Sequence, residues 1–146
     1  MKKLSIFLFL ICFFAGNPLY SVALANDAMP DIIISGLKAY EKDGPTSAIE
    51  TWIKGSPFDG SKEALSQANR FKEIESFYGN YVGYNLIHIT SLTPLTKIIY
   101  FSIDYQRGPV FCALTIYKSK NGWILTGKYN FHTDPTQILP ASLLSR

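Results

Sequence analysis

Three polar residues that could share chemistry stand together near the end of the chain, where KYNFHTDP (128–135) contains His132, Thr133 and Asp134. A histidine beside a carboxylate is an arrangement used in general acid–base catalysis, because the carboxylate orients the imidazole that carries the proton. However, an Asp followed by a Pro commonly starts a turn, and Asp134 precedes Pro135. The sequence therefore favours a turn after a strand over half of a catalytic site.

Cys112 is a second candidate, since a cysteine beside a histidine can form a nucleophile pair. If the chain turns back at Asn121-Gly122, Cys112 faces Phe131, and His132 points to the opposite face of the sheet. This register excludes a pair of Cys112 with His132. We expect Cys112 to be a small buried hydrophobe with an unreactive thiol.

His88 is the third candidate, and its orientation depends on the parity of the connection around Leu92–Leu95. An even connection turns it inward, and an odd one turns it outward. With an even connection, Val82, Tyr84 and Leu86 also point inward. With an odd connection, the inward side chains are those of Asn85, Ile87 and Ile89. An inward His88 would line an aromatic pocket with Trp52, Tyr84, Tyr105 and Tyr129, where it could act as a general base. The sequence leaves both orientations open and favours a histidine that bonds to a neighbour or to solvent.

Other reactive arrangements are missing from the sequence. Two histidines far apart and Cys112, the one cysteine that follows the apolar N-terminal run, cannot supply a usual zinc set, so we expect no metal site. There is no G-x-S-x-G elbow, phosphate loop or dinucleotide fingerprint, and we expect no cofactor.

Helical patterns fill the first half of the chain, where they would have to position these residues. Apolar positions 33, 34, 37 and 40 give residues 31–42 one helical face, which Asp43-Gly44-Pro45 ends. A short second helix is predicted in TSAIETWIK (46–54). Ser61 caps a third helix, and Gly79 ends it.

From Tyr81 onward, β-branched and aromatic residues alternate and predict strands at 81–91, 97–107, 110–119 and 123–132. The connections are LTPL (92–95), Gly108-Pro109 and Asn121-Gly122, the last of which is a strong hairpin signal. Helices followed by strands predict an α+β domain. We expect three N-terminal helices on one face of a curved antiparallel meander sheet of four strands or more.

Two-residue turns at both hairpins would give the sheet one apolar and one polar face. They pair Lys120 with Trp123 and Tyr105 with Cys112. The predicted apolar face contains Ile99, Phe101, Ile103, Tyr105, Val110, Cys112, Leu114, Ile116, Leu125, Tyr129 and Phe131. The other face contains Tyr100, Ser102, Asp104, Gln106, Ala113, Thr115, Tyr117, Thr126, Lys128, Asn130 and His132. Burying one large apolar side chain contributes roughly 1.5–3 kcal/mol, so the helices should cover the apolar face.

The order and lengths of these elements resemble the nuclear transport factor 2-like superfamily, whose cone-shaped fold lays helices across a bent sheet. The resemblance covers about residues 30–132. It is carried by YGNYVGY (78–84), by DYQRGPVFCALTIYKSKNGWIL (104–125) and by the three preceding helices. It implies a small lyase or isomerase, a ligand binder or a partner-binding module. No catalytic motif of an enzyme branch matches residue by residue, so none is carried over.

The N-terminus predicts export. MKK is followed by the apolar run LSIFLFLICFFAG (4–16) and a small-x-small ending at Ala23-Leu24-Ala25, which is typical of a signal peptide. A membrane-spanning helix needs about 20 apolar residues, and Gly16-Asn17-Pro18 ends this run too early. We therefore predict a signal peptide at 1–25 cleaved after Ala25, a single domain at 26–146, and a periplasmic or secreted protein with no membrane attachment after cleavage.

The charge of the mature chain excludes one class of partner. Losing Lys2 and Lys3 lowers the basic count from 14 to 12, against 11 acidic residues. No cluster of Lys or Arg remains, so we expect no nucleic-acid binding.

These observations predict an exported, non-catalytic module that binds a small apolar ligand or a protein partner. The polar sheet face, with Tyr100, Thr115 and Tyr117, is predicted as a docking or homodimer surface, because tyrosines are favoured at interfaces. The alternative is a small cofactor-free lyase or isomerase with His88 as its base. It requires a cavity of roughly 300 Å³ or more beside that residue.

Overall fold

The structure is a computed structural model that describes residues 28–127 and 129–145. The predicted signal peptide and its cleavage site after Ala25 lie outside the described residues. Within the described part of the chain, no helix is long and apolar enough to cross a membrane.

Three helices follow one another in the first half of the described chain: α1 (Asp31–Asp43), α2 (Pro45–Ile53) and α3 (Lys62–Tyr78). Gly44 separates the first two in a backbone conformation with φ of 84°, which favours glycine. The hydroxyl of Ser61 caps α3 by accepting a hydrogen bond from the backbone N–H of Ala64 at 3.3 Å. The predicted helices and the Ser61 cap are confirmed.

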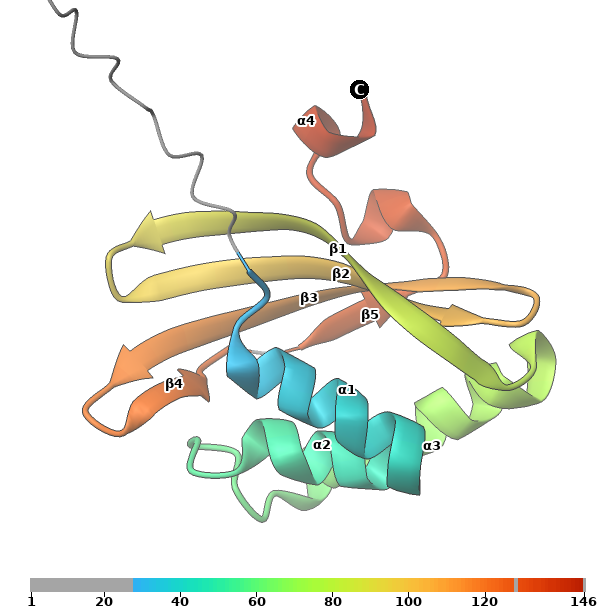
Figure 1. The fold of residues 1–146 in the computed structure, drawn as a ribbon, viewed down its shortest axis with the longest axis horizontal. Coiled ribbons are helices and arrows are strands. Elements are labelled where there is room, and N and C mark those ends of the chain that lie inside the picture. The colour runs from blue at the N-terminus through green and yellow to red at the C-terminus, as the bar shows by residue number, and fades with distance from the viewer. Residues whose placement is uncertain (1–27, 128, 146) are drawn as a thin grey trace, which may run out of the picture.

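An antiparallel sheet follows, made of β1 (Tyr81–Thr93), β2 (Thr96–Tyr105), β3 (Gly108–Ser119), β4 (Gly122–Leu125) and β5 (Asn130–His132). The strand order is β1-β2-β3-β4, and β5 also pairs with β3. Figure 1 shows α1 and α2 on one side of the sheet, with a 3-10 helix, η1 (Pro135–Gln137), and the short α4 (Ala141–Leu144) on the other. The α+β prediction is confirmed.

The predicted division of the sheet into two faces is also confirmed. Every member of the apolar face is buried except Tyr129, which is half-buried. These side chains form one core with residues from the three helices, among them Leu37, Trp52 and Phe71. On the other face, Asp104 is half-buried, His132 is exposed and Ser102 is buried. Lys128, which was also predicted there, lies outside the described residues.

Both hairpin turns lie before their predicted positions. Ser119 pairs with Gly122, so Lys120 and Asn121 form the second turn, and Tyr105 pairs with Gly108, so Gln106 and Arg107 form the first. The pairings of Lys120 with Trp123 and of Tyr105 with Cys112 were therefore wrong. The register shifts are even, two residues and four residues, and because side chains alternate with a period of two, the paired residues of β2, β3 and β4 keep their predicted faces.

Local contacts explain these positions. The Ser119 hydroxyl donates to the carbonyl of Gly122 at 2.8 Å and accepts from the N–H of Asn121 at 3.2 Å, which closes the second turn one residue early. Pro109 can stand within β3 because β5 begins to pair with that strand only at Phe111. A proline without an N–H is tolerated where a strand edge is free.

The predicted last strand, 123–132, is interrupted. Ile116 pairs with Leu125 and Ala113 with Asn130, so two residues of β3 stand opposite the four residues 126–129. The predicted pairing of Cys112 with Phe131 is confirmed, because the two extra residues in this connection compensate for the early turn. Gly127 and Tyr129 of this connection line a cleft.

Candidate functional site

The predicted interior pocket is occupied by packed side chains. Trp52 is 2% exposed, its indole N–H donates to the carbonyl of Ile33 at 3.2 Å, and its ring meets Phe101 edge-on at 6.2 Å. A Cβ atom placed on Gly36 would lie 2.0 Å from the Trp52 ring nitrogen, so the indole packs directly against the backbone of α1, where only glycine leaves room for it. Trp52 is therefore a core residue that joins helices and sheet.

Tyr105 is also buried, and it belongs to a polar link between helices and sheet. Its hydroxyl lies 2.8 Å from that of Tyr40, which donates in turn to a carboxylate oxygen of Glu75 at 3.0 Å. Tyr40 stacks on Tyr81 with ring centroids 5.1 Å apart. Burial raises the pKa of Tyr40 and of Tyr105 well above the ordinary value, so both hydroxyls stay protonated. The arrangement favours a structural role for these tyrosines.

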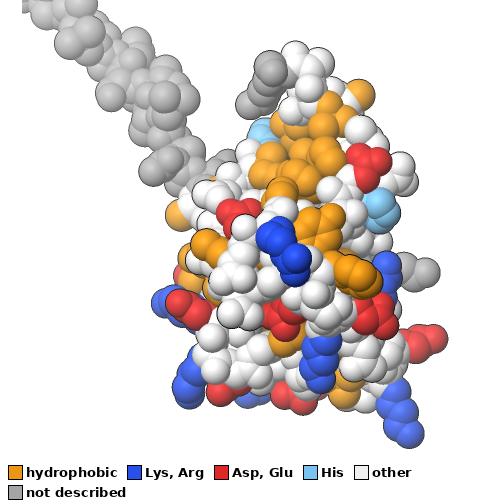
Figure 2. All heavy atoms as spheres, turned by 90° about the vertical axis from the view of Figure 1, so that its right-hand side faces the viewer, with side chains coloured by type: hydrophobic (Ala, Val, Ile, Leu, Met, Phe, Trp, Pro, Cys, Tyr) orange, Lys and Arg blue, Asp and Glu red, His pale blue; other side chains and the backbone are white. Residues whose placement is uncertain are grey.

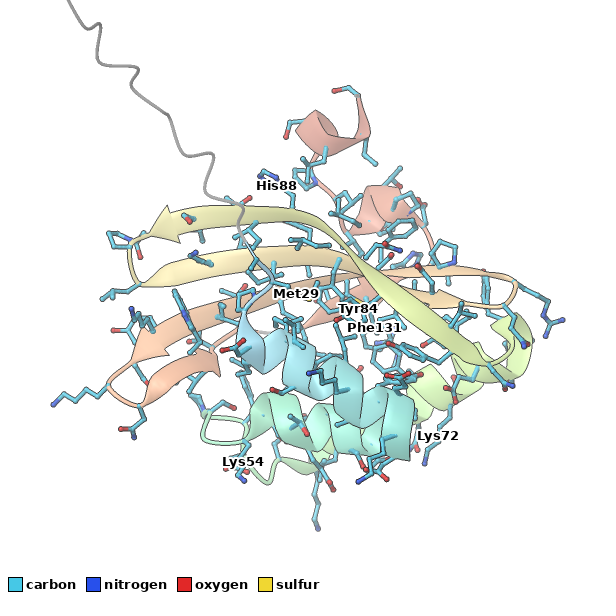
Figure 3. The ribbon with its side chains drawn as sticks, viewed as in Figure 1. Met29, Lys54, Lys72, Tyr84, His88 and Phe131 are labelled. Atoms are coloured by element: carbon cyan, nitrogen blue, oxygen red, sulfur yellow. The ribbon has the colours of Figure 1, made fainter. Side chains whose placement is uncertain are left out.

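A bulge in β1 settles the orientation of His88. Leu86 pairs with Phe101 on the helix-covered face, the register shifts at Ile87, and His88 then pairs with Tyr100 on the opposite face. Both parities considered from the sequence therefore occur, one on each side of the bulge. Figure 3 shows His88 on the side of β1 away from α1 and α2.

The five predicted pocket residues do not come together. Trp52 and Tyr105 are in the core, Tyr84 is 37% exposed on β1, and His88 lies on the opposite face. Of the five, Tyr129 is the residue that lines a cleft. The cavity that a lyase or isomerase with His88 as base requires is occupied by core side chains in the described structure.

The two other candidate pairs have structural explanations. Cys112 is buried opposite Phe131, where burial raises the pKa of its thiol, and His132 is on the other face opposite Phe111. Asp134 accepts from the backbone N–H of Thr136 at 2.9 Å and from its hydroxyl at 2.8 Å, and these bonds lower the pKa of Asp134. The His132 ring nitrogen Nδ1 accepts from the N–H of Asp134 at 2.9 Å. These contacts form the predicted turn after the strand.

A cleft of about 370 Å³ lies between α3 and the connection from β4 to β5. Its lining residues come from three segments and are Phe58, Ser61, Glu63, Ala64, Ser66, Gln67, Arg70, Gly127, Tyr129 and Asn130. The Tyr129 hydroxyl donates to the carbonyl of Ala64 and thereby joins the two walls. Burial raises the pKa of Tyr129 to about 12, so this donor keeps its proton at neutral pH.

The outer edge of β1 is the second surface of interest. Among the described strands, β1 pairs with β2 alone. Its sequence, YVGYNLIHITSLT, contains no charged residue and no proline. Val82, Tyr84 and Leu86 are 64%, 37% and 39% exposed, although Tyr84 and Leu86 belong to the face that is buried in β2 and β3. We call residues 82–86 the β1 edge segment.

The three predicted interface residues share the open face of the sheet. Tyr100 pairs with Ala113, Thr115 with Ile98, and Tyr117 with Thr96. Tyr100 in β2 is therefore diagonal to Thr115 in β3, and Tyr117 lies two residues further along β3. Tyr117 is 40% exposed, whereas Tyr100 and Thr115 are half-buried. The structure brings these three residues together on one face.

No family model, curated protein or solved structure matches this chain. The argument for a function therefore depends on the geometry of its own surfaces. The cleft residues on α3 were missed in the sequence because a charged helix face normally indicates solvent exposure. One signal was present, since Gly127 inside a predicted strand indicates a bulge or a close backbone approach. A Cβ atom at Gly127 would lie 3.1 Å from that of Thr115.

Proposed function

We propose that this chain is an exported, non-catalytic protein-binding module that adds an extended segment of a partner protein to the free edge of β1. The signal-like N-terminal sequence supports export. The resemblance to the nuclear transport factor 2-like superfamily, which includes partner-binding modules, stays a prediction that agrees with this proposal.

One observation carries the proposal: the edge strand is long, uncharged and flanked by exposed apolar side chains. Sheet edges in natural proteins are commonly protected by lysine, proline, bulges or a covering element. Within β1, the protection consists of register shifts, which leave the regular stretches Gly83–Leu86 and His88–Ser91. Each stretch is four residues long and has backbone N–H and C=O groups on its free edge that could pair with an incoming strand.

The position of the apolar side chains indicates how a partner would be selected. Strand addition obtains affinity from main-chain hydrogen bonds and specificity from alternate side chains. Tyr84 and Leu86 are alternate residues on the same face, at the margin of the helical layer. In Figure 2, apolar side chains gather near the C-terminal end, whereas charged side chains are scattered over the lower part of the molecule. A partner segment with apolar residues at alternate positions would match the β1 edge segment.

The test uses a matched pair of substitutions. Tyr84 and Tyr117 are 37% and 40% exposed, so Tyr84→Lys and Tyr117→Lys make the same chemical change at equal exposure on different surfaces. Seven-residue peptides selected by phage display on the mature chain would be synthesised, and their affinities measured by fluorescence anisotropy. We expect Tyr84→Lys to weaken binding roughly tenfold or more, because a charge protects a sheet edge and an apolar contact is lost.

Two results would contradict this proposal. Weaker binding by Tyr117→Lys with normal binding by Tyr84→Lys would place the docking surface on the open face. Failure to select any peptide with alternate apolar residues would remove strand addition. Hydrogen exchange provides a direct readout, since a bound strand should slow amide exchange in residues 83–86.

The homodimer predicted from the open face is a separate hypothesis, favoured by the clustering of Tyr100, Thr115 and Tyr117. A Tyr100→Glu and Tyr117→Glu double variant should stay folded and lose self-association. Light scattering measures the molar mass of both proteins. If the wild type and the double variant have the same mass, the hypothesis of a dimer through this face is excluded.

A further inference from the structure

The cleft between α3 and the 126–129 connection has opposite charges along its helical wall. Glu63 and Arg70 both line it, and seven residues, about 10 Å of helix axis, separate them. The salt bridge found among the described residues lies elsewhere and joins the exposed side chains of Lys42 and Asp43 at 3.9 Å. Glu63 and Arg70 make no ion pair with another described residue, and Lys128, between Gly127 and Tyr129, lies outside the described residues.

The exposed side chain of Arg70 lies over an aromatic ring. Its guanidinium carbon lies 4.7 Å from the centre of the Phe131 ring, and its Nη1 donates to the side-chain oxygen of Gln67 at 3.2 Å. Phe131 itself stacks on Phe71, with ring centroids 4.2 Å apart. A guanidinium has five N–H donors in a planar fork that matches a carboxylate. The contacts with Phe131 and Gln67 favour one orientation of this group, which lowers the conformational entropy lost on binding an anion.

The other features of the cleft suit a small ligand. Its volume of about 370 Å³ falls in the range of small-molecule sites. The hydrogen bond from Tyr129 to the carbonyl of Ala64 joins the two walls, and Phe58 contributes an aromatic side chain to the lining. The lining is thus apolar in part and charged at two points.

We propose that the cleft binds a short linear peptide of about three residues, with its terminal carboxylate on Arg70 and its amino terminus toward Glu63. An extended residue spans at most about 3.3–3.6 Å, so three residues cover about the 10 Å between the two charges. Charge complementarity at both ends distinguishes this ligand from a simple anion. The site is separate from the β1 edge segment and does not depend on the proposed function.

The probe is trialanine, titrated into the ¹⁵N-labelled mature chain. We expect saturable chemical-shift changes at the amides of Gly127 and Tyr129 and at the side-chain Nε–H of Arg70. N-acetyl-trialanine amide has the same length and no terminal charge. This capped peptide should bind at least roughly tenfold more weakly than trialanine, because its charge-assisted hydrogen bonds are lost.

Variants on α3 provide the matched controls. Arg70→Gln and Glu63→Gln should each weaken trialanine binding roughly tenfold. Lys72→Gln and Glu73→Gln remove exposed charges of the same helix that do not line the cleft, and they should leave binding unchanged. Figure 3 labels Lys72 on this helix. Tyr84→Lys should also leave it unchanged, which separates this site from strand addition at β1.

Three results would overturn the proposal. The first is the absence of saturable shifts at the cleft. The second is an equal loss of affinity for Lys72→Gln and Arg70→Gln, which would indicate attraction by net charge alone. The third is acetate binding as tightly as trialanine, which would show that the amino end and the peptide length contribute nothing.

Discussion

The middle of the sheet and its β1 margin follow the same alternation of residues but have different environments. Ile103 and Phe101 of β2 are fully buried, whereas their partners Tyr84 and Leu86 in β1 are 37% and 39% exposed. The helices cover the central strands and leave part of the margin in solvent. The same pattern therefore produces a core where a second layer covers it and an apolar rim where that layer ends.

The largest expected difference between these regions is in stability. Trp52→Ala should lower the free energy of unfolding by about 3–5 kcal/mol, because it leaves a cavity in the core. Tyr84→Ala should lower it by about 1 kcal/mol or less, because that side chain is partly in solvent already. Urea titrations followed by circular dichroism measure both changes. Equal losses would show that the rim is as tightly packed as the centre, and Trp52→Phe provides a milder core variant.

The tyrosine link between the helices and the sheet should show an intermediate and unequal effect. Tyr40→Phe removes the hydroxyl that bonds to both Tyr105 and Glu75 and should cost about 2–3 kcal/mol, since a buried group loses its partner. Tyr105→Phe leaves the bond to Glu75 intact and should cost about 1 kcal/mol. Urea midpoints of the two variants test this order, and the reverse order would contradict the direction of the hydrogen bonds.

Alkaline pH should weaken the helix-covered region through its buried tyrosines. Burial raises the pKa of Tyr81 and of Tyr129 from the ordinary 10.0 to about 12. The unfolded chain then loses these protons before the folded one, so each contribution is complete below pH 10 and is lost as pH rises toward 12. The urea midpoint should fall over this interval, and Tyr129→Phe should make the fall shallower. An unchanged slope in that variant would contradict the expected role of Tyr129.

The smallest effect is expected at the turn after β5, far from the core. Asp134→Ala removes the acceptor for the N–H and hydroxyl of Thr136 and should lower the stability only slightly, because both hydrogen bonds are exposed to solvent. Thermal unfolding measures the loss. A loss comparable to that of Trp52→Ala would show that the turn stabilises the whole domain.

Much of the fold could be predicted because its signals are local. Gly44, Ser61 and Gly79 mark helix ends, and the alternation in β2 and β3 divides core from open face. The exact turns could not be predicted from the sequence. The second turn depends on the hydrogen bonds of the Ser119 hydroxyl, and Pro109 fits into β3 because β5 pairs with that strand only from Phe111 onward. The bulge at Ile87 was hidden as well, since a parity argument assumes a regular strand. The cleft depends on contacts between α3 and residues 126–129, which are distant in sequence.

The two additional residues between β4 and β5 have a consequence for how this surface can change. Removing two residues from this connection would let 122–132 run as one uninterrupted ribbon in a single register along β3. Because the number removed is even, the residues of β4 and β5 would keep their faces, whereas the wall that Gly127 and Tyr129 give the cleft would be lost. We therefore expect the length of this segment to control whether the recess beside α3 exists.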